Sequence, residues 1–338
     1  MSSLAPDFSV IVLFGRGRLE PCLSSLLAQT ETSFEIIAVM DFDPPSPPDP
    51  RVRFLKVPDL NPAKRRNNAA AISRGKFLAF IDDDATAPPY WLAKAKLSLD
   101  ANPGIAGCGG SNIAPQQMNR KQQITDLILT DQYFGAGSTS YKISGHPHPA
   151  RPGELHLSNF FLRRESFDAV KGFNEKIGYG GEDSEMVYQI GKKTSKVLEY
   201  IPELFVFHDR REFGMELLKR NFRFRRQNGR MIRVYPDMYK WNLPLWVGLV
   251  LMMICLSLMI FTSTGFLIFL FFAALYCGFV FFSSLARLRV NYWLCFIIPF
   301  AYFLHHCSYA LGIFIGLAEG LVMGRKKLSA LLHRDDLE

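Results

Sequence analysis

The feature that most constrains the fold is the stretch KFLAFIDDDA at Lys76–Ala85. Its first part, Lys76–Ile81, is a short and nearly continuous apolar run, which is typical of a strand buried on both faces of a parallel sheet. Three carboxylates, Asp82, Asp83 and Asp84, follow directly and would repel one another at a strand tip. A bound cation removes that conflict, so the stretch predicts a Mg²⁺ or Mn²⁺ site at the carboxyl end of the strand. An acidic turn exposed to water is the simpler alternative.

Strand-like and helix-like segments alternate around this stretch. We expect strands at Ser9–Phe14, Phe34–Met40 and Arg51–Val57, and helices at Leu19–Leu27 and Ala63–Ser73. This alternation predicts a doubly wound parallel α/β sheet whose ligand lies at the carboxyl ends of the strands. Acidic residues that follow different strands would then meet along one edge of the sheet.

Two features beside that edge suit a nucleotide. Asp41 follows the second strand and could accept hydrogen bonds from a base N–H or a ribose hydroxyl, or could simply open the proline-rich loop after it. Lys64, Arg65 and Arg66 occupy the first turns of a predicted helix, where cations oppose the helix dipole. A bound diphosphate would explain these cations, and so would a solvated basic helix face.

A second landmark lies about a hundred residues further along the chain. Gly180 and Gly181 allow the backbone to turn tightly before a helix that opens with Glu182 and Asp183. A helix cap is a sufficient explanation for that acidic pair when it is considered alone. His208 follows the strand-like segment Leu204–Phe207 and could be an ordinary histidine at a strand end.

The C-terminal part of the chain is strongly apolar. Leu243–Phe261 and Phe266–Leu285 contain no charged residue, and each is long enough to cross a bilayer, for which roughly 20 residues are needed. Tyr292–Met323 is a third apolar region, but it carries histidines and Glu319. A third crossing would place Arg325–Lys327 on the side opposite to the other basic clusters, against the positive-inside rule. Two and three spans therefore both remain open.

The distribution of charge excludes nucleic acid as the expected partner. The net charge of +8 is concentrated in Lys219–Arg233, before the first apolar span, and recurs beside the later spans, where it would contact anionic lipid headgroups. The six cysteines are scattered and none has CxxC spacing, which fits reduced thiols. No signal-peptide pattern opens the sequence, so we expect the first part of the chain in the cytoplasm.

The order of these motifs resembles that of the family 2 inverting glycosyltransferases of GT-A fold. The matching elements are Asp41, the segment Arg65-Arg66-Asn67-Asn68-Ala69, the Asp82-x-Asp84 motif and the Glu182-Asp183 pair, within roughly Phe8–His208. The resemblance implies a GT-A fold, a doubly wound mixed sheet followed by transmembrane helices. It also implies a nucleotide-diphosphate sugar as donor and Mg²⁺ or Mn²⁺ as cofactor.

The resemblance further implies a role for each site residue. Asp183 would be the general base, and Glu182 beside it would be the second catalytic residue. Asp41, Arg66, Asp82 and Asp83 would bind the donor nucleotide and its diphosphate. Asp84, together with Asp82 and His208, would bind the metal.

We expect four regions and a location at the inner cell membrane. They are a catalytic domain at 1–212 on the cytoplasmic side, a basic amphipathic interfacial segment at 213–240, a transmembrane region of two or three helices at 241–324 and a polar tail at 325–338. The Gln-x-x-Arg-Trp motif of processive relatives is absent from the basic segment, which favours transfer of one sugar at a time. The apolar tail favours contact with membrane lipids and a lipid-linked glycan acceptor, as in enzymes of exopolysaccharide synthesis.

Two other classes of protein remain as alternatives. A sugar nucleotidyltransferase would use a similar sheet, but it should carry a glycine-rich phosphate loop, for which Gly15-Arg16-Gly17 is a poor match. A catalytically idle membrane partner would not need all four of Asp82, Asp84, Glu182 and Asp183.

Overall fold

The computed structural model describes residues 5–15, 19–131, 139–178, 180–239, 262–285 and 294–332. The chain forms two compact units. The first comprises Met1–Gln116 and Thr139–Asp209, and the second comprises Gln117–Ser138 and Arg210–Glu338. The predicted span Leu243–Phe261 lies outside the described residues.

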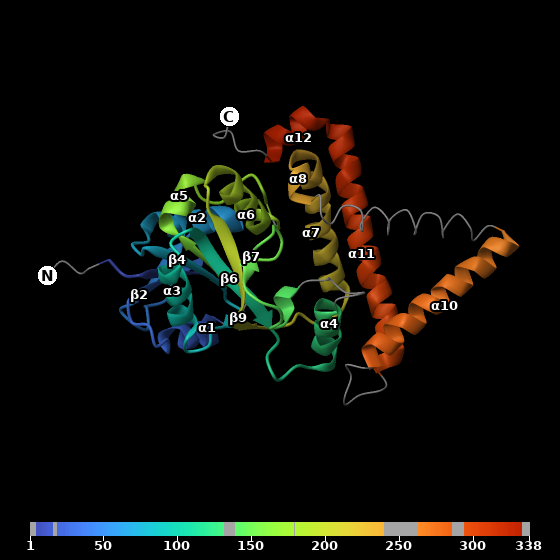
Figure 1. Cartoon of the computed structure of the whole chain (residues 1–338), viewed down its shortest axis with the longest axis horizontal. Helices are drawn as coiled ribbons and strands as arrows, with labels where there is room; N and C mark the ends of the chain where they lie inside the picture. Colours follow the sequence, from blue (N-terminus) through green and yellow to red (C-terminus); the bar gives the residue numbers. More distant parts are fainter. Residues whose placement is uncertain are drawn as a thin grey trace. The chain divides into compact units, whose positions relative to one another are not determined.

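The first unit is built on a mixed sheet with the strand order β3-β2-β1-β4-β8-β6-β9-β5, and β7 pairs with β9 (Figure 1). The first four strands of that order run parallel, whereas β8 runs antiparallel to both of its neighbours, which confirms the predicted mixed α/β sheet. The strands are β1 (Phe8–Leu13), β2 (Phe34–Met40), β3 (Val52–Lys56), β4 (Phe77–Asp82), β5 (Ala85–Thr86), β6 (Ile105–Ile113), β7 (His148–Pro149), β8 (Phe160–Arg163) and β9 (Val197–His208).

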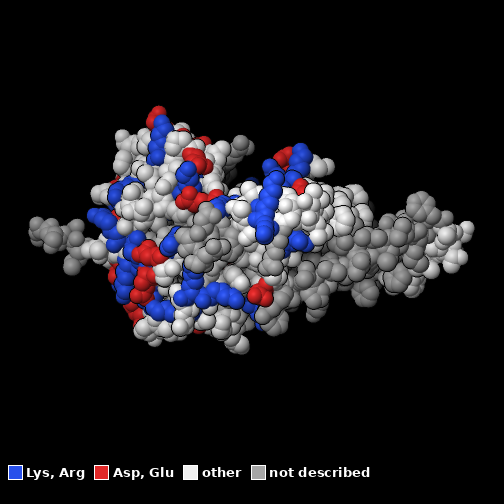
Figure 2. All heavy atoms as spheres, turned by 90° about the horizontal axis from the view of Figure 1, so that it is seen from above, with Lys and Arg blue, Asp and Glu red and all other residues white. Residues whose placement is uncertain are grey.

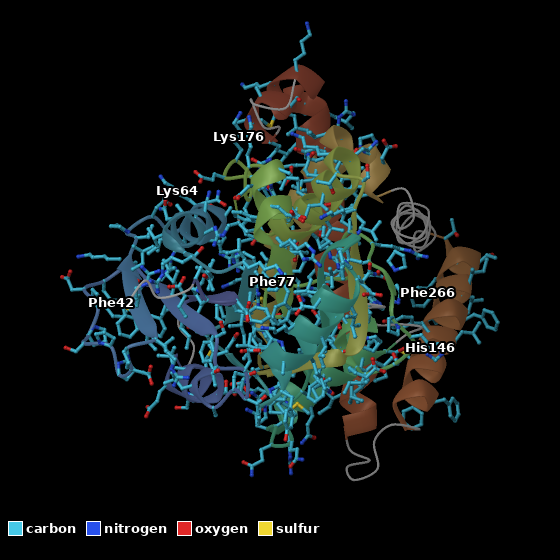
Figure 3. The ribbon with its side chains drawn as sticks, turned by 60° about the vertical axis from the view of Figure 1, so that its left-hand side comes forward. Phe42, Lys64, Phe77, His146, Lys176 and Phe266 are labelled. Atoms are coloured by element: carbon cyan, nitrogen blue, oxygen red, sulfur yellow. The ribbon has the colours of Figure 1, made fainter. Side chains whose placement is uncertain are left out.

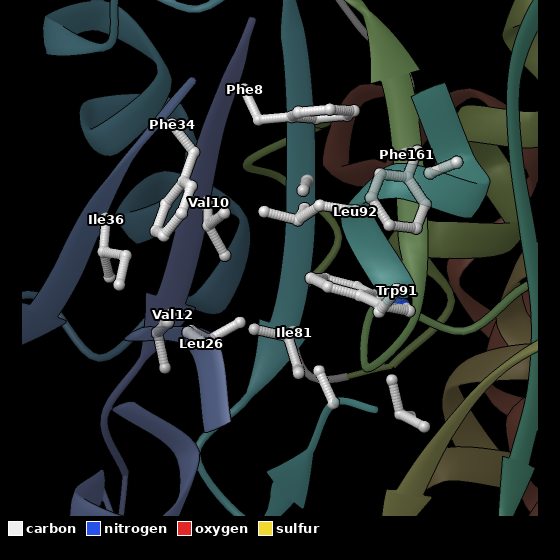
Figure 4. Close-up of a cluster of buried hydrophobic side chains, with 14 of the residues drawn as sticks. Phe8, Val10, Val12, Leu26, Phe34, Ile36, Ile81, Trp91, Leu92 and Phe161 are labelled. Carbon is white, nitrogen blue, oxygen red and sulfur yellow. The ribbon is translucent and has the colours of Figure 1, made fainter. Parts of the chain in front are cut away.

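Helices of the same unit pack on both faces of the sheet. They are α1 (Leu19–Leu27), α2 (Pro62–Ile72), α3 (Trp91–Ala101), α5 (Arg164–Ala169) and α6 (Glu182–Lys193), with a short 3₁₀ turn at Thr139–Tyr141. Because side chains alternate along a strand, β1 sends Val10 and Val12 into one core and Ile11 into the other. The first core includes Trp91, whose ring lies 4.5 Å from that of Phe161 (Figure 4). Both faces of the central strands are therefore buried, as their apolar runs predict.

Strand register brings the carboxyl ends of three strands to one edge. Leu13 at the end of β1 is paired with Val39 of β2 on one side and with Asp82 of β4 on the other. The residues that follow these strands, Asp41 and Asp83 among them, consequently leave the sheet at the same edge. This edge is where a doubly wound sheet binds its ligand.

The second unit is helical in its described residues. Its helices are α4 (Arg120–Thr130), α7 (Met215–Val234), α8 (Pro236–Tyr239), α10 (Ser263–Leu285), α11 (Leu294–Met323) and α12 (Arg325–Leu332). Helices α7 and α11 lie side by side (Figure 1). Within the described residues one segment, Ile297–Met323 of α11, is long and apolar enough to cross a membrane by length and composition. Acidic and basic side chains are intermixed over the first unit, at the left of Figure 2, whereas α10 carries no charge.

Candidate active site

A two-residue strand places His208 beside two of the predicted aspartates. After β4 ends at Asp82, the chain turns and forms β5, in which Ala85 pairs with His208 at the end of β9. The backbone N–H of Asp209 donates to the carbonyl oxygen of Asp84 at 3.0 Å and holds that turn. The Nε2 atom of His208 consequently lies 3.3 Å from an Asp84 carboxylate oxygen and 3.8 Å from one of Asp82.

These three side chains could hold a divalent cation. One ligand atom each from Asp82, Asp84 and His208 lie within 4.8 Å of one another, and the three side chains are 21–35% exposed. Two carboxylates and an imidazole suit a divalent metal, and their exposure leaves room for ligand oxygens. Within the described residues this is the only such group of acids, histidines and cysteines.

Asp83 has a different position from its two neighbours. Its side chain is buried and accepts a hydrogen bond from the backbone N–H of Gly15 at 2.9 Å. Asp83 thereby fixes the start of the loop after β1 against the end of β4. Of the three aspartates, Asp83 therefore makes a structural contact, whereas Asp82 and Asp84 belong to the partly exposed cluster with His208.

Arg66 joins the two landmarks of the sequence. Its guanidinium, only 8% exposed, lies 3.0 Å from a Glu182 carboxylate oxygen and 3.5 Å from one of Asp82. Glu182 is the first residue of α6 and Asp82 is the last of β4, so one cation on α2 links two segments a hundred residues apart. This contact brings the Asp82-x-Asp84 motif and the Glu182-Asp183 pair to one place.

The cations in the first turns of α2 have partners within the protein. Asn61 caps the helix by accepting the N–H groups of Ala63 and Lys64 at 3.0 and 3.3 Å. Arg65 is buried and donates to the carbonyl oxygens of Phe14 and Val39 at 2.8 and 2.7 Å, which ties the ends of β1 and β2 together.

Lys64 pairs with Asp59 at 2.8 Å and points to solvent (Figure 3). Asp41 stands exposed at the end of β2, next to Phe42, which is 47% exposed (Figure 3). The three cations of α2 therefore do not form one solvated basic face. Lys64 pairs with Asp59, Arg65 donates to backbone carbonyl oxygens, and Arg66 contacts Glu182 and Asp82.

The start of α6 presents Asp183 in a nearly buried setting. Gly180 and Gly181 adopt φ values of 95° and 103°, a region that favours glycine, and they turn the chain into the helix. One Asp183 oxygen accepts the backbone N–H of Ser184 at 2.7 Å. Burial raises the pKa of Asp183, while this hydrogen bond and the charge of Arg66 act in the opposite direction. Burial and the neighbouring Asp183 likewise raise the pKa of Glu182 against the pull of Arg66.

His156 is a neighbour of Asp183 that sequence reasoning missed. Its Nδ1 atom lies 4.0 Å from the second Asp183 oxygen. The backbone on either side is anchored, because Leu155 and Leu157 are buried in the core, and the imidazole lies against the ring of Tyr141 at 5.5 Å. No local pattern marks His156, since its proximity to Asp183 arises only when a loop before β8 packs on the start of α6.

Two other candidate places do not match this one. His148 lies 3.5 Å from Glu154 and is not part of the cluster of Asp82, Asp84 and His208, the only group of metal-binding side chains in the described residues. A cavity of about 390 Å³ is lined by Lys76, Phe77, Arg163, Arg164, Glu165 and Asp168. It lies at the amino end of β4, whereas Asp82 ends that strand.

The mixed sheet with its edge cluster has the GT-A fold, and comparison with known proteins indicates a glycosyltransferase. Residues 10–157 match the model of the family Glycosyl transferase family 2, so this part of the chain is a glycosyltransferase domain of that family. The fold also matches the mannosyltransferase PcManGT from Pyrobaculum calidifontis, solved with GDP-Man and Mn²⁺, with a TM-score of 0.54 and 15% identity over 91% of this chain and 88% of that one.

Two curated relatives each match 209 residues. A glucosyl-dolichyl phosphate glucuronosyltransferase from Haloferax volcanii is 24% identical over 209 residues, which are 57% of this chain and 65% of the relative. The uncharacterized glycosyltransferase EpsJ of Bacillus subtilis is 22% identical over 209 residues, which are 56% of this chain and 57% of the relative. The matched stretch therefore spans less than two thirds of either relative.

Proposed function

We propose that this glycosyltransferase moves a sugar, with inversion, from a nucleotide-diphosphate sugar to a hydroxyl of a lipid-linked glycan, one sugar at a time. The observation that carries the proposal is the position of Arg66, which contacts both Asp82 and Glu182. It thereby brings the candidate metal site of Asp82, Asp84 and His208 next to the nearly buried Glu182-Asp183 pair. A metal-binding edge and a base beside it are the two parts that a metal-dependent inverting transfer needs.

The cluster of Asp82, Asp84 and His208 would hold Mg²⁺ or Mn²⁺ together with the donor diphosphate. The metal, when bound, supplies positive charge for the departing nucleoside diphosphate. Arg66 adds a fixed positive charge beside this cluster. Asp41, exposed at the same edge, would accept hydrogen bonds from the nucleoside, and Asp83 would hold the loop that borders it.

Asp183 would act as the general base. It takes the proton of the acceptor hydroxyl while that oxygen bonds to the anomeric carbon and the bond from this carbon to the diphosphate breaks. The electron pair of the broken bond leaves with the nucleoside diphosphate. Its raised pKa makes Asp183 a better proton acceptor than an exposed carboxylate. Glu182 would hold Arg66 in place rather than touch the substrates.

A lipid-linked acceptor and membrane lipids follow from the second unit and from one relative. Charge-free α10 is 23 residues long, and the segment Ile297–Met323 after it is apolar enough to associate with a membrane. The name of the Haloferax volcanii relative couples a glucuronosyltransferase to glucosyl-dolichyl phosphate. We therefore propose a multi-pass protein of the inner cell membrane whose first unit faces the cytoplasm.

A panel of nucleotide sugars, incubated with the full chain and polyprenyl-linked acceptors with and without EDTA, tests the proposal. A metal-dependent transferase releases a nucleoside diphosphate and moves the sugar into the lipid fraction. Formation or use of pyrophosphate would indicate a nucleotidyltransferase, and neither product would indicate an idle partner. Product found only in the aqueous fraction would overturn the lipid-linked acceptor.

A further inference from the structure

The apolar helix α11 is covered on one side, near its start, by the polar helix α4. Ile298 and Tyr302 of α11 pack against Ile124 and Ile128 of α4. The Tyr302 hydroxyl also donates to the carbonyl oxygen of Leu127 at 3.0 Å and to the Asp131 carboxylate at 2.9 Å. The first half of α11 is thus held by a helix that begins Arg120-Lys121-Gln122-Gln123 and is not itself suited to hydrocarbon.

Further along, α7 covers the same side of α11 at very close range. A Cβ atom on Gly312 would lie 2.6 Å from the carbonyl oxygen of Phe222, and one on Gly316 would lie 2.0 Å from that of Arg226. Only glycine permits such an approach of two helix backbones. The two helices run in the same direction, because later residues of α7 meet later residues of α11.

Polar contacts extend this pairing in both directions. The side chain of Asn221 contacts His305 at 3.2 Å near one end. Near the other end, Arg230 lies 2.7 Å from a Glu319 oxygen, and Arg226 donates to the same carboxylate at 2.9 Å. From His305 to Glu319 the paired length is about 21 Å at 1.5 Å per residue, which is most of the thickness of a bilayer core.

The charge of α7 does not allow this pair to cross a bilayer. Over its length α7 carries Lys219, Arg220, Arg223, Arg225, Arg226, Arg230 and Arg233, against the single acid Glu216. Basic side chains are strongly disfavoured in the hydrocarbon region, and Glu319 neutralises only part of this charge. The contacts with α11 extend over α7 from Asn221 to Arg233. Helix α11 therefore cannot cross the bilayer without taking the cations of α7 into the hydrocarbon region.

The opposite side of α11 is apolar and exposed. Its exposed residues fall on one stripe of a helix with 3.6 residues per turn: Ile297, Phe300, Phe303, Leu311, Phe314, Ile315, Leu321 and Val322, each at least 36% exposed. Helix α10 contacts the first half of α11, where Tyr276 lies 3.0 Å from His306, and the stripe still remains exposed in the described part of the chain. A continuous apolar stripe of this length is too large for an ordinary aqueous surface.

We propose that α11 lies in the plane of an anionic membrane interface, with its exposed stripe among the acyl chains and α7 on the headgroup side. Charge complementarity identifies the partner, because Lys219 and Arg223 of α7 and Lys326 and Lys327 of α12 are exposed and would meet anionic headgroups. This placement depends on the membrane association in the proposed function but not on the enzyme activity. It also avoids the conflict with the positive-inside rule that a third crossing would create, because the basic residues after α11 stay on the side of the membrane where α11 begins.

Depth measurements along the stripe test this placement. Spin labels are attached singly at Phe300→Cys, native Cys307, Phe314→Cys and Leu321→Cys, with the other cysteines replaced, in the full chain reconstituted in phosphatidylcholine–phosphatidylglycerol vesicles. An interfacial helix gives the same shallow depth at all four positions, read as relative access to oxygen and to a water-soluble nickel chelate. A crossing helix gives a profile that is deepest at the middle positions and shallow at the ends, which would overturn the proposal. Labels shielded from both reagents would show a protein surface, such as a second copy, in place of lipid, and would also overturn it.

Labelling from one side of the membrane gives a second and independent test. A membrane-impermeant maleimide is applied to intact cells and to inverted vesicles that contain Ser329→Cys, with Ser3→Cys as the matched control for the N-terminal side. The interfacial placement predicts that both sites react from the same side of the membrane, above the background of the unsubstituted chain. Reaction of the two sites from opposite sides would show that α11 crosses. Neither readout requires a known substrate, so a failed nucleotide-sugar assay leaves this test intact.

Discussion

At the scale of single residues, the site is defined by one arginine that two carboxylates share. Arg66 lies between Asp82 and Glu182 and is almost fully buried, so water screens its charge only weakly. The sequence predicts where the acidic motifs lie, because one directly follows an apolar strand and the other opens a helix after two glycines. It does not predict the shared cation, because that contact forms only when α2, which packs on β1 and β2, brings Arg66 to the end of β4 and the start of α6.

Asp84→Asn should remove one of the metal ligands while leaving the fold intact. We expect the transfer rate to fall at least about a hundredfold, which corresponds to about 2.7 kcal/mol of transition-state stabilisation, together with weaker Mn²⁺ binding measured by electron paramagnetic resonance of the free ion. Asp43→Asn is the matched control, because Asp43 is an exposed acid after β2 that pairs with Lys56 at 2.6 Å. Equal Mn²⁺ affinity in the two variants would contradict the assigned metal cluster.

His156→Gln should alter the pH dependence of the reaction. Asp183 works in its deprotonated form, so activity rises as the pH passes through its pKa, which burial has raised. The groups that face Asp183 are Glu182, Arg66, Ser184 and His156. The His156 Nδ1 atom lies 4.0 Å from an Asp183 oxygen, beyond hydrogen-bond distance, and an N–H dipole there would favour the carboxylate form, so its loss should move the acidic limb of the profile to higher pH.

In the same variant we expect the maximal rate to fall about tenfold, with little change in the KM for the donor. His148→Gln serves as the control, since His148 also faces a carboxylate, that of Glu154, at 3.5 Å, but is not near Asp183. An unchanged acidic limb in His156→Gln would exclude a role for His156 in positioning the base.

At the scale of elements, the buried parallel strands are the most predictable part of the molecule. Phe34–Met40 is confirmed residue for residue, and Arg51–Val57 is confirmed within one residue at each end. The predicted strand Leu204–Phe207 is only the end of β9, which runs from Val197 to His208. Glu199, Pro202 and Glu203 obscure that strand, because charged residues and proline in its sequence are not typical of a sheet interior.

The strand β5 has only two residues, which is too short to show a periodic pattern in the sequence. It forms because the chain after Asp84 meets the end of β9, and this pairing positions His208 for the metal cluster. Sequence analysis could therefore nominate His208 only through the family resemblance. Its distance from Asp84 is a property of the folded sheet.

Gly316→Ala tests the close approach of α7 and α11. The added methyl group would lie 2.0 Å from the carbonyl oxygen of Arg226, so the helices must separate, at a cost of about 1–3 kcal/mol. We expect a lower thermal midpoint for the chain in detergent, followed by circular dichroism at helical wavelengths. Gly278→Ala in α10 is the matched control, because no described atom lies within 4 Å of its added Cβ and alanine favours a helix. A midpoint lowered equally in both variants would argue against a specific contact at Gly316.

At the scale of the whole molecule, stability should depend on the ligands of the edge cluster. On the proposed function, Mn²⁺ with a nucleoside diphosphate would bind only the folded first unit, so at a hundred times the dissociation constant it should stabilise that unit by about 2.7 kcal/mol. Differential scanning fluorimetry in detergent should show a rise in the unfolding midpoint that EDTA removes. Asp84→Asn should lose most of this rise, and a rise that survives in EDTA would contradict metal-dependent nucleotide binding.

The division of the chain has a practical consequence for anyone who wishes to crystallise the catalytic part alone. Residues 117–138, which contain α4, interrupt the first unit in sequence but belong to the second. A fragment that stops at Asp209 would keep α4 while deleting Ile298 and Tyr302, the residues that shelter Ile124 and Ile128. Such a fragment would expose the apolar side chains of α4 to water and would tend to aggregate. Replacing residues 117–138 by a short polar linker should give a more soluble fragment.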